Sequence, residues 1–246
     1  MINQKLIDKT LEYFDRFSNE SFVVKPSLPI LYFGDLTAYL ESPLKILTVG
    51  KNPSDNEFRL RKNDNYSFCR FKKWHTNDFN LIETLNPYFE NEPLQWFSSF
   101  EPILNGTSSS YYKGNYENRV LHTDICSPIS TNPTWSKLTN DQRNHLYKDG
   151  LVIWKELIEE LQPDVMFISV PLKLFNEVIP SIGKELITFN KKKDNTKRKK
   201  NYRVYIHEHY LKSEKRVKVI FGQAANKPFD TISNEQKYLI GELCKK

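Results

Sequence analysis

The sequence has few cysteines and no long apolar segment, and both absences limit what the protein can be. Its three cysteines, Cys69, Cys126 and Cys244, form no C-x-x-C pair, which disfavours a disulfide framework, a structural zinc site and a four-cysteine iron–sulfur cluster. No apolar run approaches the roughly 20 residues that cross a bilayer, and the first residues lack the apolar core of a signal peptide. We therefore predict a cytoplasmic protein with no metal, iron–sulfur cluster, other cofactor or membrane partner.

Charge and composition favour a globular protein with an anionic partner. The 246 residues are 39% hydrophobic and 13% aromatic, which is typical of a folded chain with a sizeable core. Lys and Arg number 36 against 30 Asp and Glu, giving a formal charge of +6. This excess makes nucleic acid the first candidate partner, and improved solubility is the alternative explanation.

The order of hydrophobic patterns predicts an α/β fold. Apolar, β-prone runs alternate with segments of helical spacing, and Thr139 and Ser233 each begin a capping-box pattern with a glutamine three residues later. We expect a three-layer αβα sandwich with a mostly parallel sheet of about four or five strands, forming a single domain over residues 1–246 with its core at about 45–240. The expected strands are 45–49, 120–125, 165–170, 203–206 and 217–221, and the expected helices are 4–17, 79–85, 94–104, 139–161, 171–179 and 233–243.

Residues 45–53, KILTVGKNP, carry the first candidate site. The apolar run ends at Gly50, and Asn52 and Pro53 follow immediately, which places a carboxamide on a stiff backbone beyond the carboxyl end of a strand. Ligand sites in open α/β sheets are built at such strand ends. An ordinary turn is the alternative, because Gly, Asn and Pro are common turn residues.

Residues 191–200, KKKDNTKRKK, form a strongly basic segment. We expect a basic loop at about residues 190–202. It is either a solvated surface loop, as most lysine runs are, or an arm that contacts phosphates without reading sequence.

Three segments in order resemble the uracil-DNA glycosylase superfamily. Residues 50–53, GKNP, resemble its first motif, and Asn52 matches the mismatch-specific and single-strand-selective branches. Residues 120–128, VLHTDICSP, resemble the strand whose end reads the pyrimidine edge, and residues 164–175, DVMFISVPLKLF, resemble the strand, turn and helix before the last motif. The resemblance covers about residues 45–240 and implies a uracil-DNA-glycosylase-like fold and a monofunctional DNA N-glycosylase.

The sequence departs from this family at its second motif. The family has His-Pro-Ser or Asn-Pro-Ser there, whereas this chain reads GQAANKPF at residues 222–229. Gln223 or Asn226 would supply a carboxamide donor for base binding, and His207 and His209 on the preceding strand are further alternatives.

The resemblance implies a role for Asn52, which would orient the attacking water because a carboxamide is a poor base. Asp55 and Glu57 are candidate general bases if they point inward, and exposed loop carboxylates otherwise. Backbone N–H groups around Lys51 and Ser54 are candidates to stabilise the departing base.

Residues 66–71, YSFCRF, supply the candidates for stacking and for backbone contacts. The family places a phenylalanine after the first motif, so Phe68 or Phe71 would stack on the flipped base, with a core position as the alternative. Neighbouring basic residues would bind flanking phosphates of single- or double-stranded DNA. The candidates for this contact are Lys51, Arg70, Lys72, Lys73 and Lys227.

The residues that match the family's edge reader are Thr123 and Asp124. An ionised aspartate only accepts hydrogen bonds, so it suits an amino-bearing edge such as that of cytosine better than uracil. A modified cytosine or adenine is therefore a possible substrate, and capping of the following turn is the alternative role for Asp124.

Three functions are consistent with these features. The first is a metal-free, monomeric DNA glycosylase that hydrolyses the N-glycosidic bond of a flipped uracil or modified base. The second is a catalytically inactive nucleic-acid-binding protein that retains the fold, and the third is a small-molecule hydrolase or transferase that uses the same strand ends.

Overall fold

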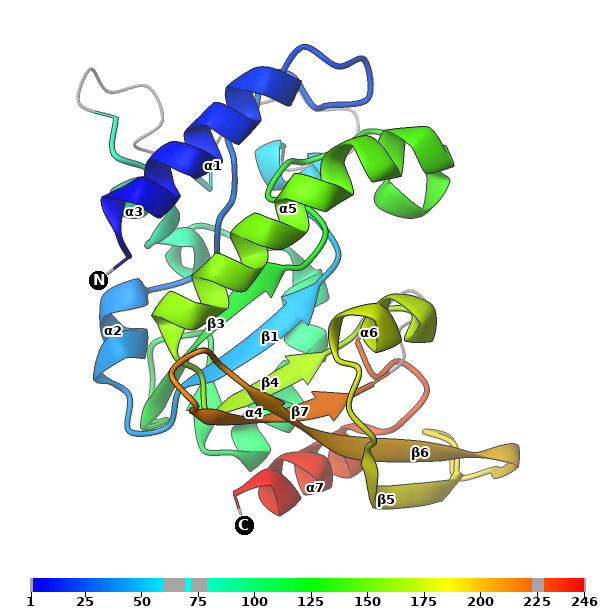
Figure 1. Cartoon of the computed structure of the whole chain (residues 1–246). Coiled ribbons are helices and arrows are strands. Elements are labelled where there is room, and N and C mark those ends of the chain that lie inside the picture. The colour runs from blue at the N-terminus through cyan, green and yellow to red at the C-terminus, as the bar shows by residue number, and fades with distance from the viewer. Residues whose placement is uncertain (1, 60–69, 72–78, 223–227, 246) are drawn as a thin grey trace. The chain divides into compact units, whose positions relative to one another are not determined.

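The computed structural model describes residues 2–59, 70, 71, 79–222 and 228–245 (Figure 1). It is an α/β protein with a mostly parallel sheet flanked by helices. The strands are β1 (Ile46–Gly50), β2 (Ser109–Ser110), β3 (Asn118–Asp124), β4 (Val165–Ile168), β5 (Lys184–Lys191), β6 (Lys197–Tyr210) and β7 (Arg216–Phe221). The α-helices are α1 (Gln4–Phe17), α2 (Leu36–Glu41), α3 (Leu81–Leu85), α4 (Glu101–Gly106), α5 (Asn140–Leu161), α6 (Leu172–Val178) and α7 (Asn234–Cys244). Short 3-10 helices lie at Asp55–Phe58, Tyr88–Glu90, Gln95–Ser99 and Trp135–Lys137.

The described part of the sheet has seven strands in the order β2-β3-β1-β4-β7-β6-β5. Strand β4 pairs in parallel with β1 and β7, and β2 pairs in parallel with β3. The last two pairings, β7 with β6 and β6 with β5, are antiparallel. The expected count of four or five strands is wrong because the short β2 and the strand β5 were not recognised.

The chain divides into two compact units that alternate along the sequence. Unit 1 comprises Met1–Leu36, Gly50–Leu94 and Leu121–Leu161, and unit 2 comprises Thr37–Val49, Gln95–Val120 and Gln162–Lys246. A single domain over residues 1–246 stays a prediction, and each unit is described separately. None of the helices within the described ranges has the length and apolar character needed to cross a membrane.

In unit 1, the expected first helix and the longest helix lie side by side as α1 and α5 (Figure 1). Their contact includes a buried hydrogen bond of 2.8 Å from the Tyr13 hydroxyl to the Leu146 carbonyl. The capping box predicted before α5 is present, with both bonds between Thr139 and Gln142 formed. The buried face of α5 includes Trp154, as expected.

In unit 2, helices α4 and α7 cross at unusually short range. A Cβ atom built on Gly241 would lie 2.1 Å from the carbonyl oxygen of Ile103, and one on Gly106 would lie 2.2 Å from that of Tyr238. Only glycine lets the two backbones approach so closely. The predicted capping box at Ser233 and Gln236 begins α7.

The basic segment is not the loop that was predicted. Residues 190–202 belong mostly to an antiparallel hairpin of β5 and β6, and only residues 192–196 form its turn. Asn195 there adopts a positive φ of 64°, a conformation that asparagine tolerates better than most residues. The lysine run was not recognised as part of two strands because its side chains are exposed to solvent, although its backbone is paired in the sheet.

The helix crossing generates a stability prediction. Gly241→Ala raises helix propensity by about 1 kcal/mol, yet its methyl group would overlap the Ile103 carbonyl. We expect the overlap to dominate and the free energy of unfolding to fall by about 1–3 kcal/mol, measured by urea denaturation. Glu242→Ala, on an exposed position of the same helix, is the control and should change stability by less than about 0.5 kcal/mol. Equal stability of Gly241→Ala and the wild type would contradict the close crossing.

Candidate active site

In unit 1, the segments that follow β1 and β3 run beside each other. The backbone N–H groups of Ile125 and Cys126 donate to the carbonyls of Gly50 and Lys51, at 3.1 and 2.8 Å. Further along, Ser54 forms a parallel bridge with Thr131. Residues 50–54 and 125–131 are therefore adjacent, and they overlap two of the three segments that carry the family resemblance, residues 50–53 and 120–128.

The Asn52 side chain is fixed between these two segments. Its amide nitrogen donates to the carbonyls of Pro53 (2.9 Å) and Ile129 (3.3 Å) and to the Thr131 hydroxyl (3.0 Å). Its carbonyl oxygen accepts no hydrogen bond from the residues that the structure describes, and the residue is partly exposed. The amide is thus anchored by its nitrogen and offers its oxygen as an acceptor.

The Asp55–Phe58 turn directs Glu57 into the protein, where it is 4% exposed. The Tyr88 hydroxyl donates a hydrogen bond of 2.5 Å to the Glu57 carboxyl. Burial raises the pKa of Glu57 to about 8; the Tyr88 hydrogen bond and the Arg70 charge oppose this rise, and Asp124 and Asp55 add to it. Glu57 is therefore mostly a neutral acid at pH 7, which makes it a poor general base there.

Asp55, a predicted catalytic residue, is also buried, and its carboxylate forms an ion pair with Arg59 four residues later. The Arg59 guanidinium therefore already engages this carboxylate within the turn. This geometry favours a positioning role for Asp55 in the turn over a role as general base. The alternative that Asp55 and Glu57 are exposed loop carboxylates is wrong.

The roles predicted for Arg70 and Phe71 do not fit their positions. Arg70 is 3% exposed, and its guanidinium donates to the backbone carbonyls of Asn56 (3.0 Å), Arg59 (2.9 Å) and Glu92 (2.8 Å). Arg70 therefore holds the turn that carries Glu57 and cannot reach a phosphate from this position.

Phe71 is fully buried in an aromatic cluster, with ring centroids 5.4 Å from Phe58 and 5.7 Å from Tyr88. It has no face available for a flipped base. The core position that was the alternative for Phe71 is the one observed.

Asp124 and Thr123 lie on opposite faces of β3, because side chains alternate along a strand. Asp124 approaches His122, with 3.5 Å between a carboxylate oxygen and Nε2, and a Cβ atom built on Gly50 would lie 2.6 Å from the same oxygen. Thr123 is fully buried and accepts a hydrogen bond of 3.1 Å from Trp154 Nε1. The prediction that Thr123 reads a base edge is therefore wrong, and Asp124 is the candidate that remains beside Gly50.

Several predicted residues are not placed in this site. Half-exposed Lys51 contributes its carbonyl to the segment pairing, and its side chain stays a candidate for phosphate contact. His207 and His209 belong to β6 in unit 2. The remaining candidates lie outside the described residues: Phe68, Lys72, Lys73, Gln223, Asn226 and Lys227.

Sequence reasoning missed His122 and Tyr88. His122 lies two residues before Asp124, so the strand period of two was a signal that both face the same side. No comparable signal joins Tyr88 to Glu57, which lie 31 residues apart.

The described part of the chain contains no group of three or more His, Cys, Asp or Glu side chains that could hold a metal ion. What the geometry offers instead is an Asn52 amide that is anchored through its nitrogen, and a buried acceptor at Asp124 packed against the Gly50 backbone. Such groups orient a water molecule and a polar ligand edge without supplying a strong base.

The buried carboxyl of Glu57 predicts a pH-dependent stability. Its pKa rises from 4.5 to about 8 on folding, so the folded protein retains a proton that the unfolded chain releases in this window. The stabilising contribution is complete below pH 4.5 and is lost as pH rises toward 8. We expect Glu57→Gln to gain stability relative to the wild type by up to about 1.4 kcal/mol per pH unit across this range, measured by urea denaturation.

Glu12→Gln, which removes an exposed carboxylate from α1, is the control and should follow the wild-type pH profile. Parallel profiles for Glu57→Gln and the wild type would show that Glu57 is ionised in the folded protein at neutral pH.

A scan against protein-family models gives no match for this chain, and a search of curated proteins gives none either. The resemblance to the uracil-DNA glycosylase superfamily therefore depends on the three sequence segments alone, residues 50–53, 120–128 and 164–175.

Proposed function

We propose that this protein is a monofunctional DNA glycosylase that hydrolyses the N-glycosidic bond of a flipped base. In this reaction a water oxygen bonds to C1′ of the deoxyribose, and the bond from C1′ to the base nitrogen breaks. The electron pair of that bond leaves with the base, and the water proton passes to solvent. The proposal includes a three-layer sandwich of uracil-DNA-glycosylase type, which the α/β fold and mostly parallel sheet support.

The fixed carboxamide of Asn52 is the observation that carries this proposal. Three hydrogen bonds from its nitrogen hold the group and leave its oxygen to accept from water. A preoriented acceptor lowers the entropic cost of placing the nucleophile, without the need for a strong base. The role that the resemblance implies for Asn52 is therefore compatible with its surroundings.

Asp124 is the proposed base-reading residue. Its carboxylate lies over the β1 backbone at Gly50, directly beside the pair of segments that holds Asn52. In its ionised form it accepts from an amino group and cannot donate to a carbonyl oxygen. This chemistry favours an amino-bearing base, such as a modified cytosine or adenine, over uracil.

The second candidate function is a nucleic-acid-binding protein without catalysis. The burial of Arg70 and Phe71 favours it, because two residues expected to contact DNA serve the core instead. The two functions differ in whether an abasic product forms.

We expect Asn52→Ala to abolish base release, with a loss of about a hundredfold or more in single-turnover rate, because the water loses its oriented acceptor. The measurement is alkaline cleavage of abasic product from oligonucleotides that each carry one modified base, in single- and double-stranded form. Asn56→Ala removes the same group from an exposed position of the following turn, Asp55–Phe58, and should stay within about twofold of the wild-type rate. Tight DNA binding with no abasic product from any substrate would favour the binding protein.

We expect Asp124→Asn to change the choice of base, because an amide both donates and accepts. Release of an amino-bearing base should fall about tenfold or more relative to release of uracil, measured as the ratio of the two single-turnover rates. If uracil is released by the wild type, is lost in Asn52→Ala and is unaffected by Asp124→Asn, the proposed reading of an amino group is wrong.

A further inference from the structure

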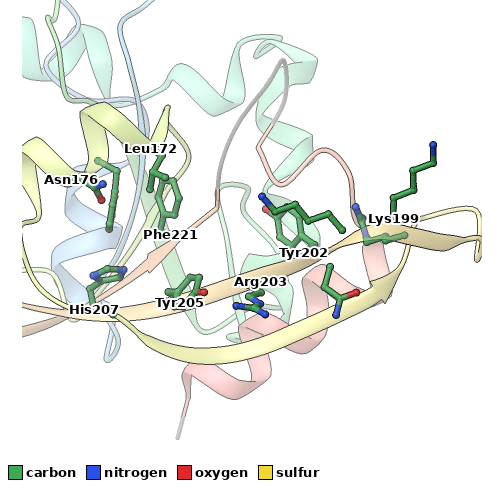
Figure 2. A pocket seen from close by; sticks show the side chains of 13 residues that line it. Leu172, Asn176, Lys199, Tyr202, Arg203, Tyr205, His207 and Phe221 are labelled. Carbon is green, nitrogen blue, oxygen red and sulfur yellow. The ribbon is translucent and has the colours of Figure 1, made fainter.

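A pocket of about 890 Å³ lies along β6 in unit 2, and none of the residues that line it is among those proposed for base release. Figure 2 shows Leu172, Asn176, His207 and Phe221 at one end and Lys199 at the other. From Lys199 to His207, at about 3.3 Å per residue, the strand that lines it is about 26 Å long. The pocket is therefore an elongated groove.

The hairpin that forms this groove carries the whole charge excess of the protein. Residues 184–210 contain nine Lys and Arg against three Asp and Glu, a formal charge of +6. The rest of the chain contains 27 residues of each sign, so its formal charge is zero. An anionic partner would be attracted to this hairpin before any other segment.

The cations of the groove are mostly available to a ligand. Lys199 and Lys200 are exposed, and no acidic group among the described residues lies within ion-pair distance of either. Arg203 is exposed, interacts with the neighbouring Tyr205 side chain and lies 3.8 Å from Glu185 in a loose ion pair, whose two side chains are both about half-exposed. Pairs of this kind contribute little, so a phosphate would compete for Arg203 at small cost.

Planar groups are interleaved with these cations. The Arg198 guanidinium donates to the carbonyls of Lys191 and Thr231 and lies 5.4 Å above the ring centroid of Tyr202. Tyr205 is half-buried in the groove and pairs across the sheet with Phe221. Flat faces beside exposed cations are the arrangement that binds bases and phosphates of a single strand.

Packed aromatic rings line the end of the groove near α6. The Phe175 ring lies 4.2 Å from Phe221 and 4.8 Å from His207 in centroid distance. The His207 ring also packs against Gly183, where a Cβ atom would lie 2.4 Å from Nε2, and its Nδ1 lies 2.9 Å from the Ser181 carbonyl. These contacts hold His207 in place, so it has a structural role at this end of the groove.

We propose that this groove binds single-stranded nucleic acid, with Lys199, Lys200 and Arg203 contacting phosphates and Tyr205 stacking on a base. A duplex keeps its bases stacked internally and would leave Tyr205 without a partner, and an acidic peptide would use the cations alone. The groove is a binding site in its own right and does not depend on glycosidic hydrolysis elsewhere in the protein.

The test is the fluorescence anisotropy of a labelled oligothymidylate of about twenty nucleotides, titrated with the full chain over a range of salt concentrations. The hairpin variant combines Lys199→Gln, Lys200→Gln and Arg203→Gln. The control variant combines Lys5→Gln, Lys148→Gln and Lys155→Gln, which removes the same charge from exposed positions of α1 and α5. Tyr205→Leu removes the aromatic face and retains an apolar side chain.

We expect the hairpin variant to bind at least tenfold more weakly. The slope of log affinity against log salt should also become shallower by about two, because each of the three lost phosphate contacts contributes about 0.7 to it. The control variant should stay within about threefold of the wild type. Tyr205→Leu should bind about fivefold or more weakly with an unchanged salt slope, because it removes stacking and no charge. An oligouridylate probe tests whether RNA binds equally, and unchanged thermal unfolding of each variant shows that the fold is retained.

Three outcomes would overturn the proposal. Equal losses in the hairpin and control variants would mean that only net charge matters. Tighter binding of a duplex of the same length would assign the groove to double-stranded DNA. Complete displacement of the oligothymidylate by polyglutamate at an equal concentration of charge would assign it to acidic peptides.

Discussion

Two backbone hydrogen bonds, from Ile125 and Cys126 to the carbonyls of Gly50 and Lys51, join the segments that follow β1 and β3. Because these segments lie together, the Asn52 amide can donate to Ile129 and Thr131, and Asp124 comes to lie over Gly50. The candidate active site therefore depends first on these backbone hydrogen bonds, which bring its side chains together.

The parts of the fold that were predictable are those with local physical signals. Capping boxes at Thr139 and Ser233 and helical spacing after Gln4 identified three helices. Strand β5 was missed because a hairpin on a solvated basic surface lacks the buried apolar pattern by which strands are recognised. The antiparallel extension of the sheet could be learned only from the three-dimensional pairing.

The site was predictable to a smaller extent. Asn52 could be placed from the end of a strand and the residues around it. Phe71 was a stacking candidate because the family has a phenylalanine after the first motif, and Arg70 was assigned to phosphates because it is a basic residue beside it. Their burial is decided by contacts with Asn56, Phe58 and other residues that the local sequence does not specify. The error at Thr123 could have been avoided from the sequence. Consecutive residues of a strand point to opposite faces, so Thr123 and Asp124 could not both face the same ligand.

Gly50 has a consequence that reaches beyond the site's geometry. A single methyl group there would lie 2.6 Å from the Asp124 carboxylate and 3.0 Å from the His122 ring. Any side chain at position 50 would therefore force Asp124 and His122 to move from the end of β1. One added methyl group would thus displace the proposed base-reading carboxylate while every polar residue of the candidate site stayed the same.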